Sequence, residues 1–301
     1  MADTLANISE ELAATVATAG AGVVRVDGRR RLGASGIVWS EDGLIVTANH
    51  VLESDDNIKI GLPDGGAAAA TLVGRDPTTD VAVLRADATG LAPLAWSDPG
   101  DARVGNLVVA VGRPGKTVQA TLGIVSALGS GWRTRAGGHI DTYLQTDLVM
   151  YPGFSGGPLV DSSGRALGLN SSALLRGVTV SIPAPTIRQV VELLVEHGRI
   201  SRGYLGIGAQ TARLPEALAT EIGQETGLLL VSVEEGSPAQ RAGLVLGDTV
   251  VALDGGPIRQ QDDLLAALGA DTVGKTLSAK IVRGGEARDL SLTVGERPGG
   301  D

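Results

Sequence analysis

The sequence contains no cysteine, and aromatic residues make up only 2% of its 301 residues. Without cysteine, no disulfide can indicate whether the protein works in an oxidising compartment. With so few aromatic rings, the hydrophobic cores must be built from valine, leucine, isoleucine and alanine. The composition therefore predicts an interior packed with small aliphatic side chains.

Basic charge is scarce as well, and the formal net charge is −9. Because phosphate binding needs a basic face, this balance argues against a nucleic-acid partner. We interpret the one basic cluster, Arg29 to Arg31, as a solvated loop. No run reaches the roughly 18 apolar residues of a membrane span, and the first twenty residues lack the basic segment of a secretory signal. We therefore predict a cytoplasmic protein, with the periplasm or cell envelope as the alternative if an export signal or anchor was removed.

Short valine-rich runs and 44 glycines dominate the sequence instead, which is typical of a β-rich fold with many turns. A first group of seven strands is expected at residues 23–26, 36–39, 44–47, 57–61, 68–74, 82–85 and 106–111. A second group is expected at 118–128, 142–145, 158–160, 166–171 and 177–182. Two successive groups without helical spacers predict a double antiparallel barrel within residues 21–200.

Two helices are expected to flank this barrel region. Residues 1–20 form a short helical segment with Leu5, Ile8 and Leu12 on one face, although Ser9 could instead cap a shorter helix. Residues 184–197 form a second amphipathic helix that leads into a separate domain at 201–301.

Ser155 lies in the glycine-rich stretch QTDLVMYPGFSGGPLVD, residues 145–161. Glycines on both sides allow positive φ angles, so that backbone N–H groups can converge beside the hydroxyl. A serine nucleophile of acyl transfer needs such donors where the oxyanion forms. A glycine-rich hairpin explains this stretch equally well when it is considered alone.

His50 follows an apolar strand in LIVTANHVLE, and Asp80 precedes another in RDPTTDVAVL. Each has a plain structural explanation, as a structural histidine and a turn aspartate. Their chain order with Ser155, however, is that of the chymotrypsin-type triad. Histidine and aspartate fall in the first strand group and serine in the second, which places the three in a cleft between two barrels.

The segments VTANHVLE, TTDVAVL, TLGIVSALG, PGFSGGPLVD and VSIPA together resemble the HtrA (high-temperature-requirement A) family of serine proteases, in the same order and at very similar spacings. The resemblance covers nearly the whole chain. It implies an all-β dominated fold, with a chymotrypsin-like double β-barrel followed by a PDZ domain. It also implies an ATP-independent endopeptidase, a serine protease of protein quality control in the stress response, that cleaves unfolded or damaged polypeptides.

The resemblance also assigns roles to residues. Ser155 would be the nucleophile, His50 the general base, and Asp80 the group that orients the imidazole. Gly153 and Ser155 would supply the oxyanion-hole N–H groups. The chain departs from the family pattern at two positions, Phe154 and Asn49, where the family usually has asparagine and alanine.

The loop at residues 129–140 resembles the family's regulatory loop, with Arg133 and Arg135 as candidate relays or simply as part of a solvated loop. We expect the S1 pocket to be lined by the segment at 170–173 and the strand around 178–182. Since these side chains are small and aliphatic, cleavage after Val, Ala, Leu or Ile is predicted. The substrate-binding residues of this segment are Asn170, Ser171, Ser172 and Ala173.

The last hundred residues resemble a PDZ domain of the HtrA type, on the strength of GYLGIG and the SPAQRAGL…GD pattern. A peptide C-terminus would be captured by the backbone of one loop and would add as a strand beside a helix at 261–268. That loop comprises Tyr204, Leu205, Gly206, Ile207 and Gly208.

Two segments, 110–117 and 269–276, match P-loop patterns, but β-like rather than helical sequence follows each of them. We interpret both as turns. The sequence has no HExxH and no paired histidines, so we predict no metal site and no cofactor.

Two functions remain open from the sequence. The first is an endopeptidase whose PDZ domain binds peptide C-termini. The second is a catalytically locked, chaperone-like or scaffolding protein, which Phe154 favours. Family members form homotrimers that resemble funnels. The resemblance therefore implies a homotrimer here, with Leu5, Ile8 and Leu12 as the candidate contact residues.

Overall fold

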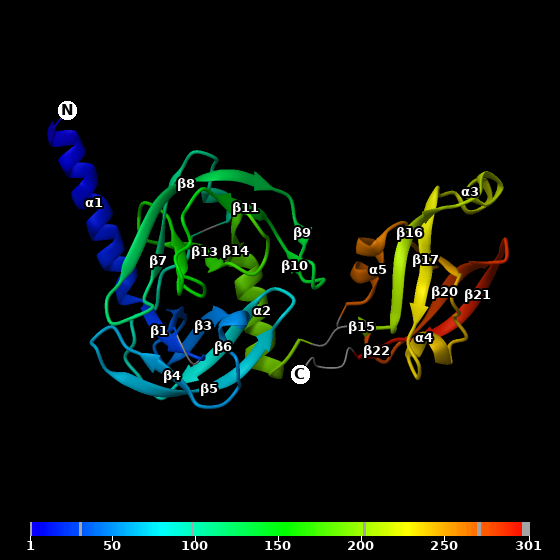
Figure 1. The fold of residues 1–301 in the computed structure, drawn as a ribbon, viewed down its shortest axis with the longest axis horizontal. Helices are drawn as coiled ribbons and strands as arrows, with labels where there is room; N and C mark the ends of the chain where they lie inside the picture. Colours follow the sequence, from blue (N-terminus) through cyan, green and yellow to red (C-terminus); the bar gives the residue numbers. More distant parts are fainter. Residues whose placement is uncertain (1, 30–31, 98, 201–202, 270–271, 297–301) are drawn as a thin grey trace. The chain divides into compact units, whose positions relative to one another are not determined.

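The computed structural model describes residues 2–29, 32–97, 99–200, 203–269 and 272–296. It divides into two compact units, residues 1–200 and 201–301 (Figure 1). Within the described residues no helix is long and apolar enough to cross a membrane.

The first unit contains two closed antiparallel barrels, which confirms the predicted double barrel. Barrel one has the strand order β1-β2-β3-β6-β5-β4, and barrel two the order β11-β14-β13-β12-β7-β8. The strands of barrel one are β1 (Val23–Asp27), β2 (Ala34–Val38), β3 (Leu44–Ala48), β4 (Ile58–Gly61), β5 (Ala67–Asp76) and β6 (Val81–Ala86). Those of barrel two are β7 (Leu107–Gly112), β8 (Gln119–Gly129), β11 (Tyr143–Thr146), β12 (Pro158–Val160), β13 (Ala166–Ser171) and β14 (Thr179–Pro183).

One strand was grouped wrongly from the sequence. The run at 106–111 was expected to be the seventh strand of the first group, but β7 pairs with β8 and β12 and so belongs to barrel two. An apolar run shows that a strand exists, whereas its partner is decided by register and by contacts distant in sequence.

Short elements connect and cover the barrels. The 3₁₀ turns η1 (Asn49–Val51) and η2 (Pro99–Asp101) follow β3 and precede β7, and the hairpin β9 (Trp132–Arg133) with β10 (His139–Ile140) extends the loop after β8. Helix α2 (Ala184–His197) packs against β5 and β6 of barrel one and β13 and β14 of barrel two. Because α2 contacts both barrels, it helps to fix their relative placement.

The N-terminal helix α1 (Ala2–Ala21) coincides with the predicted helical segment, and Ser9 lies inside it rather than capping a shorter helix. Leu5 and Ile8 are exposed, whereas Leu12 packs on the first core. The three residues share a face, but only two are available for further contacts.

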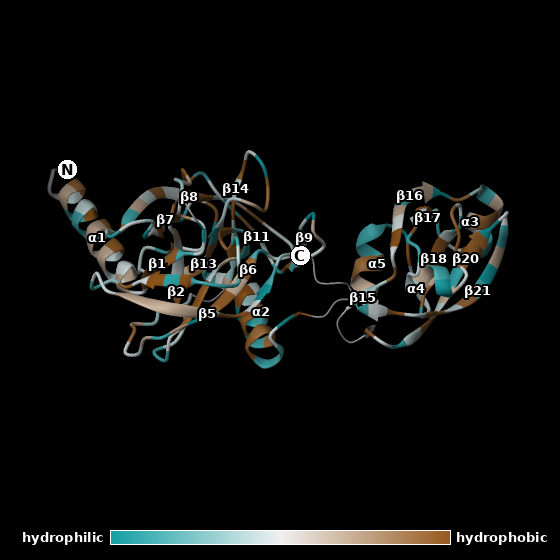
Figure 2. Cartoon of the chain, turned by 60° about the horizontal axis from the view of Figure 1, so that its bottom comes forward, coloured by the Kyte–Doolittle hydropathy of each residue, from teal (hydrophilic) through white to brown (hydrophobic). Residues whose placement is uncertain are grey.

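The cores of the barrels follow from the composition. Hydrophobic stretches run along the barrel strands (Figure 2), and the main buried cluster consists of Val, Ile, Leu and Ala side chains. The chain's single phenylalanine, Phe154, is completely buried in the smaller cluster of barrel two. Its ring therefore belongs to the core and not to the surface beside Ser155.

The second unit is built on one antiparallel sheet of order β16-β17-β18-β20-β21, with β19 paired to β18. Its strands are β15 (Gly203–Tyr204), β16 (Ile207–Arg213), β17 (Thr226–Val233), β18 (Thr249–Leu253), β19 (Gly256–Pro257), β20 (Thr276–Arg283), β21 (Glu286–Thr293) and β22 (Gly295–Glu296), of which β15 and β22 pair separately. Its helices are α3 (Glu216–Ile222), α4 (Pro238–Arg241) and α5 (Gln261–Ala267). Ser237 caps the short helix α4 through its side chain, which accepts from the Gln240 N–H.

Candidate active site

His50 and Asp80 form a close pair at one end of barrel one. Strand β3 pairs with β6 so that Ala48 is opposite Val81, and this register brings the residues after β3 beside those before β6. Nδ1 of His50 lies 2.8 Å and 3.0 Å from the two carboxylate oxygens of Asp80, and the His50 backbone N–H donates to Asp80 Oδ1 at 2.9 Å. Since Nδ1 faces a carboxylate, it carries the ring proton and leaves Nε2 free to accept one.

Asp80 is held rigidly, with 4% of its surface exposed. Its φ of +63° is in the left-handed region, which aspartate and asparagine tolerate better than most residues. The Ser171 hydroxyl donates to Asp80 Oδ2, and the N–H of Asn49 donates to the Asp80 carbonyl. Asn49, one of the two departures from the family pattern, thus contributes its backbone to the placement of Asp80.

Ser155 comes from barrel two, in the turn before β12. Gly153 and Gly156 have φ angles of +90° and +86°, and a Cβ on Gly156 would lie 2.1 Å from the Ser35 carbonyl oxygen. Only glycine fits such a position. The turn therefore passes directly against barrel one, which places Ser155 beside His50.

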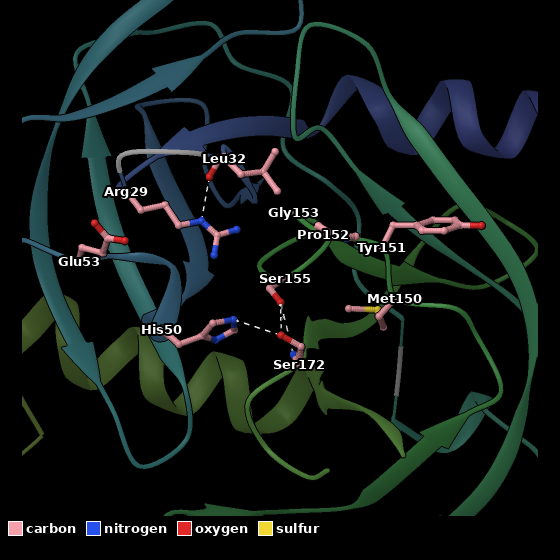
Figure 3. A pocket seen from close by; sticks show the side chains of 10 residues that line it. All are labelled: Arg29, Leu32, His50, Glu53, Met150, Tyr151, Pro152, Gly153, Ser155 and Ser172. Carbon is pink, nitrogen blue, oxygen red and sulfur yellow. Dashed lines mark hydrogen bonds between the residues drawn. The ribbon is translucent and has the colours of Figure 1, made fainter. Parts of the chain in front are cut away.

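The Ser155 hydroxyl is bonded to Ser172 in this structure (Figure 3). Its Oγ lies 3.1 Å from Ser172 Oγ and accepts from the Ser172 N–H at 3.3 Å. Ser172 Oγ in turn lies 3.4 Å from His50 Nε2. The structure thus brings the three predicted triad residues together, with Ser172 between nucleophile and base.

The two proposed oxyanion donors, Gly153 and Ser155, both line the pocket in front of the serine. Within the described residues neither N–H donates a hydrogen bond to a protein acceptor. Phe154, between them, points its ring into the core against Tyr151, and its N–H donates to the Tyr151 carbonyl at 3.1 Å. The sequence raised the concern that Phe154 disturbs this loop, but the buried ring does not enter the pocket.

The pocket beside Ser155 has a volume of about 670 Å³, and its wall differs from the predicted one. Of the four predicted substrate-binding residues, only Ser172 lines it. Asn170 is fully buried and bonds to Pro158 and Ser181, Ser171 bonds to Asp80, and the Ala173 N–H donates to Ser171. The other wall residues are Arg29, Leu32, His50, Glu53, Met150, Tyr151, Pro152, Gly153 and Ser155.

Two of these wall segments were missed. Met150 to Pro152 directly precede Gly153 in the sequence, so their place beside the serine could have been inferred. Arg29 was interpreted as part of a solvated loop; its side chain also lines the pocket and donates an exposed hydrogen bond to the Leu32 carbonyl at 2.8 Å. Arg30 and Arg31 lie outside the described residues.

The predicted regulatory loop at 129–140 contacts the turn that carries Asp80. Thr134 Oγ1 donates to the Thr78 carbonyl at 2.6 Å, and a Cβ on Gly138 would lie 2.4 Å from the same oxygen. Arg133 donates to Gly137 within its own loop. The contact is therefore made by Thr134, which the sequence did not single out, and not by Arg133.

The second unit presents an open sheet edge at β16, beside α5. The loop before β16 includes Gly206 with a φ of +74°, and Tyr204 donates its hydroxyl to Glu234. An extended peptide can pair with such an edge strand, while backbone N–H groups of the loop receive its terminal carboxylate.

The two P-loop matches do not have the required context. Residues 110–117 run from the end of β7 to the residues before β8, with no helix between them. The second match includes residues 270–271, outside the described ranges, and strand β20 begins at its last residue, Thr276.

The described part of the chain contains no cluster of three His, Asp or Glu side chains that could hold a metal ion.

Comparison with known proteins agrees with this architecture. Residues 34–169 match the trypsin-like peptidase domain, and residues 203–294 match the PDZ domain. Among solved structures, an HtrA-type protease, AlgW with tripeptide, is 31% identical, with 96% of this chain and 98% of that chain covered and a TM-score of 0.76. The serine endoprotease from Yersinia pestis is 29% identical, with coverages of 94% and 97% and a TM-score of 0.77.

Curated relatives are longer than this chain. A probable periplasmic serine endoprotease, DegP-like, of Halomonas elongata is 37% identical over 276 residues, which is 90% of this chain and 57% of that protein. The protein of the same name in Rhizobium meliloti is 36% identical over 279 residues, 90% of this chain and 54% of its own length. The chain thus spans little more than half the length of these relatives.

These relatives also correct the predicted location. They are named periplasmic endoproteases, which points to the periplasm and makes the cytoplasmic prediction wrong. The prediction relied on the first twenty residues, and the absence of a signal from them does not locate a protein.

Proposed function

The chain belongs to the HtrA family of serine endoproteases, and on this premise we propose that it cleaves unfolded or damaged polypeptides by an acyl-enzyme mechanism without ATP. One observation carries the proposal: Asp80 holds His50 by Nδ1 at 2.8 Å, with Ser155 beside the imidazole in an open pocket. This constellation suits acyl transfer, because a weak nucleophile, a base and a group that orients the base lie in one site.

In the acylation step, Ser155 Oγ attacks the substrate carbonyl carbon while His50 Nε2 takes the hydroxyl proton. Asp80 keeps the proton on Nδ1 and stabilises the imidazolium that forms. The Gly153 and Ser155 N–H groups receive the developing oxyanion, an interaction that is typically worth about 10²–10³ in rate per donor. His50 then gives its proton to the leaving amine, and the peptide bond breaks.

In the deacylation step, water replaces the amine. His50 takes a proton from the water as it attacks the ester carbon, and returns one to Ser155 Oγ. The catalytic cycle then starts again, and the proposed steps use no metal or cofactor.

The wall of the pocket supports a preference for aliphatic residues before the cleaved bond. Met150 and Leu32 contribute apolar surface, so we keep the expectation of cleavage after Val, Ala, Leu or Ile. Cuts found chiefly after charged residues would contradict it.

The second unit and the N-terminal helix suggest the partners. We propose that the β16 edge captures peptide C-termini, as a tether for substrates or as a regulator. We further propose a homotrimer whose contacts include the exposed Leu5 and Ile8 of α1. The alternative of a locked scaffold loses its one supporting feature, because the Phe154 ring is buried in the core.

The proposed activity is tested by digestion of a reduced, unfolded protein with the parent chain and with Ser155→Ala. A fluorophosphonate probe reports the reactivity of the serine in the same samples. Cleavage and labelling should both vanish in Ser155→Ala, and cleavage that persists in this variant would overturn the assignment. Ser97→Ala is a matched control, since Ser97 is a buried serine that bonds to Asp161 rather than to the site.

A further inference from the structure

We propose that Ser35, a residue of barrel one, positions the oxyanion loop of barrel two, an inference that rests on the proposed protease function. The oxyanion loop is defined here as residues 153–157. Ser35 lies in β2 and is fully buried. It reaches across from one barrel to the other, so it is a positioning residue and not a catalytic one.

Ser35 holds the carbonyl groups of both proposed oxyanion donors. Its hydroxyl donates to the Gly153 carbonyl at 2.7 Å, and its backbone N–H donates to the Ser155 carbonyl at 3.1 Å. The two carbonyls belong to the peptide units 153–154 and 155–156. The unit between them, 154–155, carries the Ser155 N–H. When both neighbouring units are fixed, the unit between them has little freedom to rotate its N–H away from the pocket.

The loop is also packed tightly against Ser35. A Cβ on Gly156 would lie 2.1 Å from the Ser35 carbonyl oxygen, and one on Gly157 would lie 3.1 Å from Ser35 Cβ. The Thr47 hydroxyl donates to the same Ser35 carbonyl at 2.7 Å. The loop therefore cannot approach barrel one more closely, and the two hydrogen bonds prevent it from moving away.

Arg113 links Ser35 to the end of helix α1. The Arg113 N–H donates to Ser35 Oγ at 2.8 Å, which leaves the hydroxyl proton for Gly153. Its buried guanidinium donates to the carbonyls of Gly20, at 2.8 Å, and Val23, at 2.7 Å. Burial lowers the pKa of Arg113, and within the described residues its guanidinium donates to carbonyl oxygens. The last turn of α1 thus belongs to the same hydrogen-bonded chain as the oxyanion loop.

The expected consequence is specific to the transition state. The hole acts on charge that develops only during reaction, so a loosened loop lowers kcat and leaves substrate binding nearly unchanged. We expect Ser35→Ala to lower kcat at least about tenfold with KM within about twofold. A peptide boronate, which forms a tetrahedral adduct with Ser155, should bind more weakly by a similar factor.

The test compares Ser35→Ala, Ser35→Cys, Ser97→Ala and Ser155→Ala in the full chain. Thiol is a weaker donor than hydroxyl, so Ser35→Cys should fall between parent and Ser35→Ala even if the alanine variant folds poorly. Ser97→Ala removes a buried hydroxyl outside the site and should keep the parent kcat. Thermal unfolding checks that each variant is folded at the assay temperature.

The outcomes separate this inference from the proposed function. A parent-like kcat and boronate affinity in both Ser35 variants, with activity lost in Ser155→Ala, would overturn the role of Ser35 alone. Equal losses in Ser35→Ala and Ser97→Ala would show a general effect of lost buried hydrogen bonds and would also overturn it. Activity retained in Ser155→Ala would instead overturn the protease function.

Discussion

The hydroxyl of Ser172 lies 3.1 Å from the hydroxyl of Ser155 and 3.4 Å from Nε2 of His50. The side-chain and backbone partners of Ser155 Oγ in the described structure both belong to Ser172. In the proposed mechanism Ser155 transfers its hydroxyl proton to His50, and a Ser155 hydroxyl that donates to Ser172 has to leave that bond first. On this arrangement Ser172 stabilises the resting state of the proposed nucleophile.

We expect Ser172→Ala to raise the rate of serine labelling by a fluorophosphonate. One such hydrogen bond is worth about 1 kcal/mol net, which corresponds to a roughly fivefold change in rate. The second-order labelling constant measures this directly, without any choice of peptide substrate. A slower reaction in Ser172→Ala would mean that Ser172 assists proton transfer instead of competing with it.

Asp80→Asn should nearly abolish peptide cleavage while the fold is preserved. Asparagine tolerates the φ of +63° at this position, but its amide cannot fix the proton on His50 Nδ1. In the triads of well-studied serine proteases the equivalent change lowers kcat about 10⁴-fold. Steady-state kinetics with a peptide substrate, together with circular dichroism, measure both effects; a loss below about tenfold would exclude Asp80 as the group that orients the base.

The three proposed triad residues could be selected from the sequence because their signals are local. His50 follows a strand, Asp80 precedes one, and Ser155 lies between glycines, and the resemblance to the family then assigned a role to each. The architecture followed in the same way from alternating strands and turns, and it is confirmed by the two barrels and by the PDZ-like unit.

The rest depended on contacts between barrels. Ser35 lies 118 residues from Gly153 in the chain, and nothing in its own strand indicates that its hydroxyl crosses to the oxyanion loop. The assignment of β7 to the wrong barrel has the same origin, since register is set by partners far away in the sequence. Arg29 shows a further limit, because the sequence of its loop does not indicate that its side chain lines the pocket beside Ser155.

Asp248 and Arg283 should contribute substantially to the stability of the second unit. Asp248 is fully buried, and Arg283 forks onto its two oxygens at 2.7 Å each. Removal of one partner from a buried pair costs about 3–5 kcal/mol, and we expect about 2–3 kcal/mol for Asp248→Asn because roughly a third of Arg283 is exposed. Urea denaturation of the full chain, followed as two transitions, measures the difference.

The same pair gives a pH dependence. Burial raises the pKa of Asp248, but the bonds from Arg283 and the Val245 N–H lower it more, so its folded pKa is below the usual 3.8. The contribution of ionised Asp248 to the free energy of unfolding is therefore complete above pH 3.8. It is lost as the pH falls through the pKa of Asp248 in the folded state. The stability gap between parent and Asp248→Asn should be constant near neutrality and shrink in acid. Glu286→Gln, at an exposed pair, should change stability by less than about 0.5 kcal/mol.

Gly206→Ala should weaken capture of peptide C-termini by the second unit at least about tenfold, because charge-assisted hydrogen bonds to a carboxylate contribute about 1.5–3 kcal/mol each. A Cβ on Gly206 would lie 2.3 Å from Ser237 Cβ, and φ is +74°, so alanine must displace the loop that offers its N–H groups. Gly255→Ala is the matched control, since it has a similar φ of +79° but open space around it.

Fluorescence anisotropy of a labelled peptide, in a Ser155→Ala background that prevents cleavage, gives the affinities. The peptide with a free C-terminal carboxylate should bind Gly206→Ala more weakly than the parent. The same peptide with a C-terminal amide should bind weakly to every variant. Equal affinity of the parent for the two peptides would show that the loop does not receive the carboxylate.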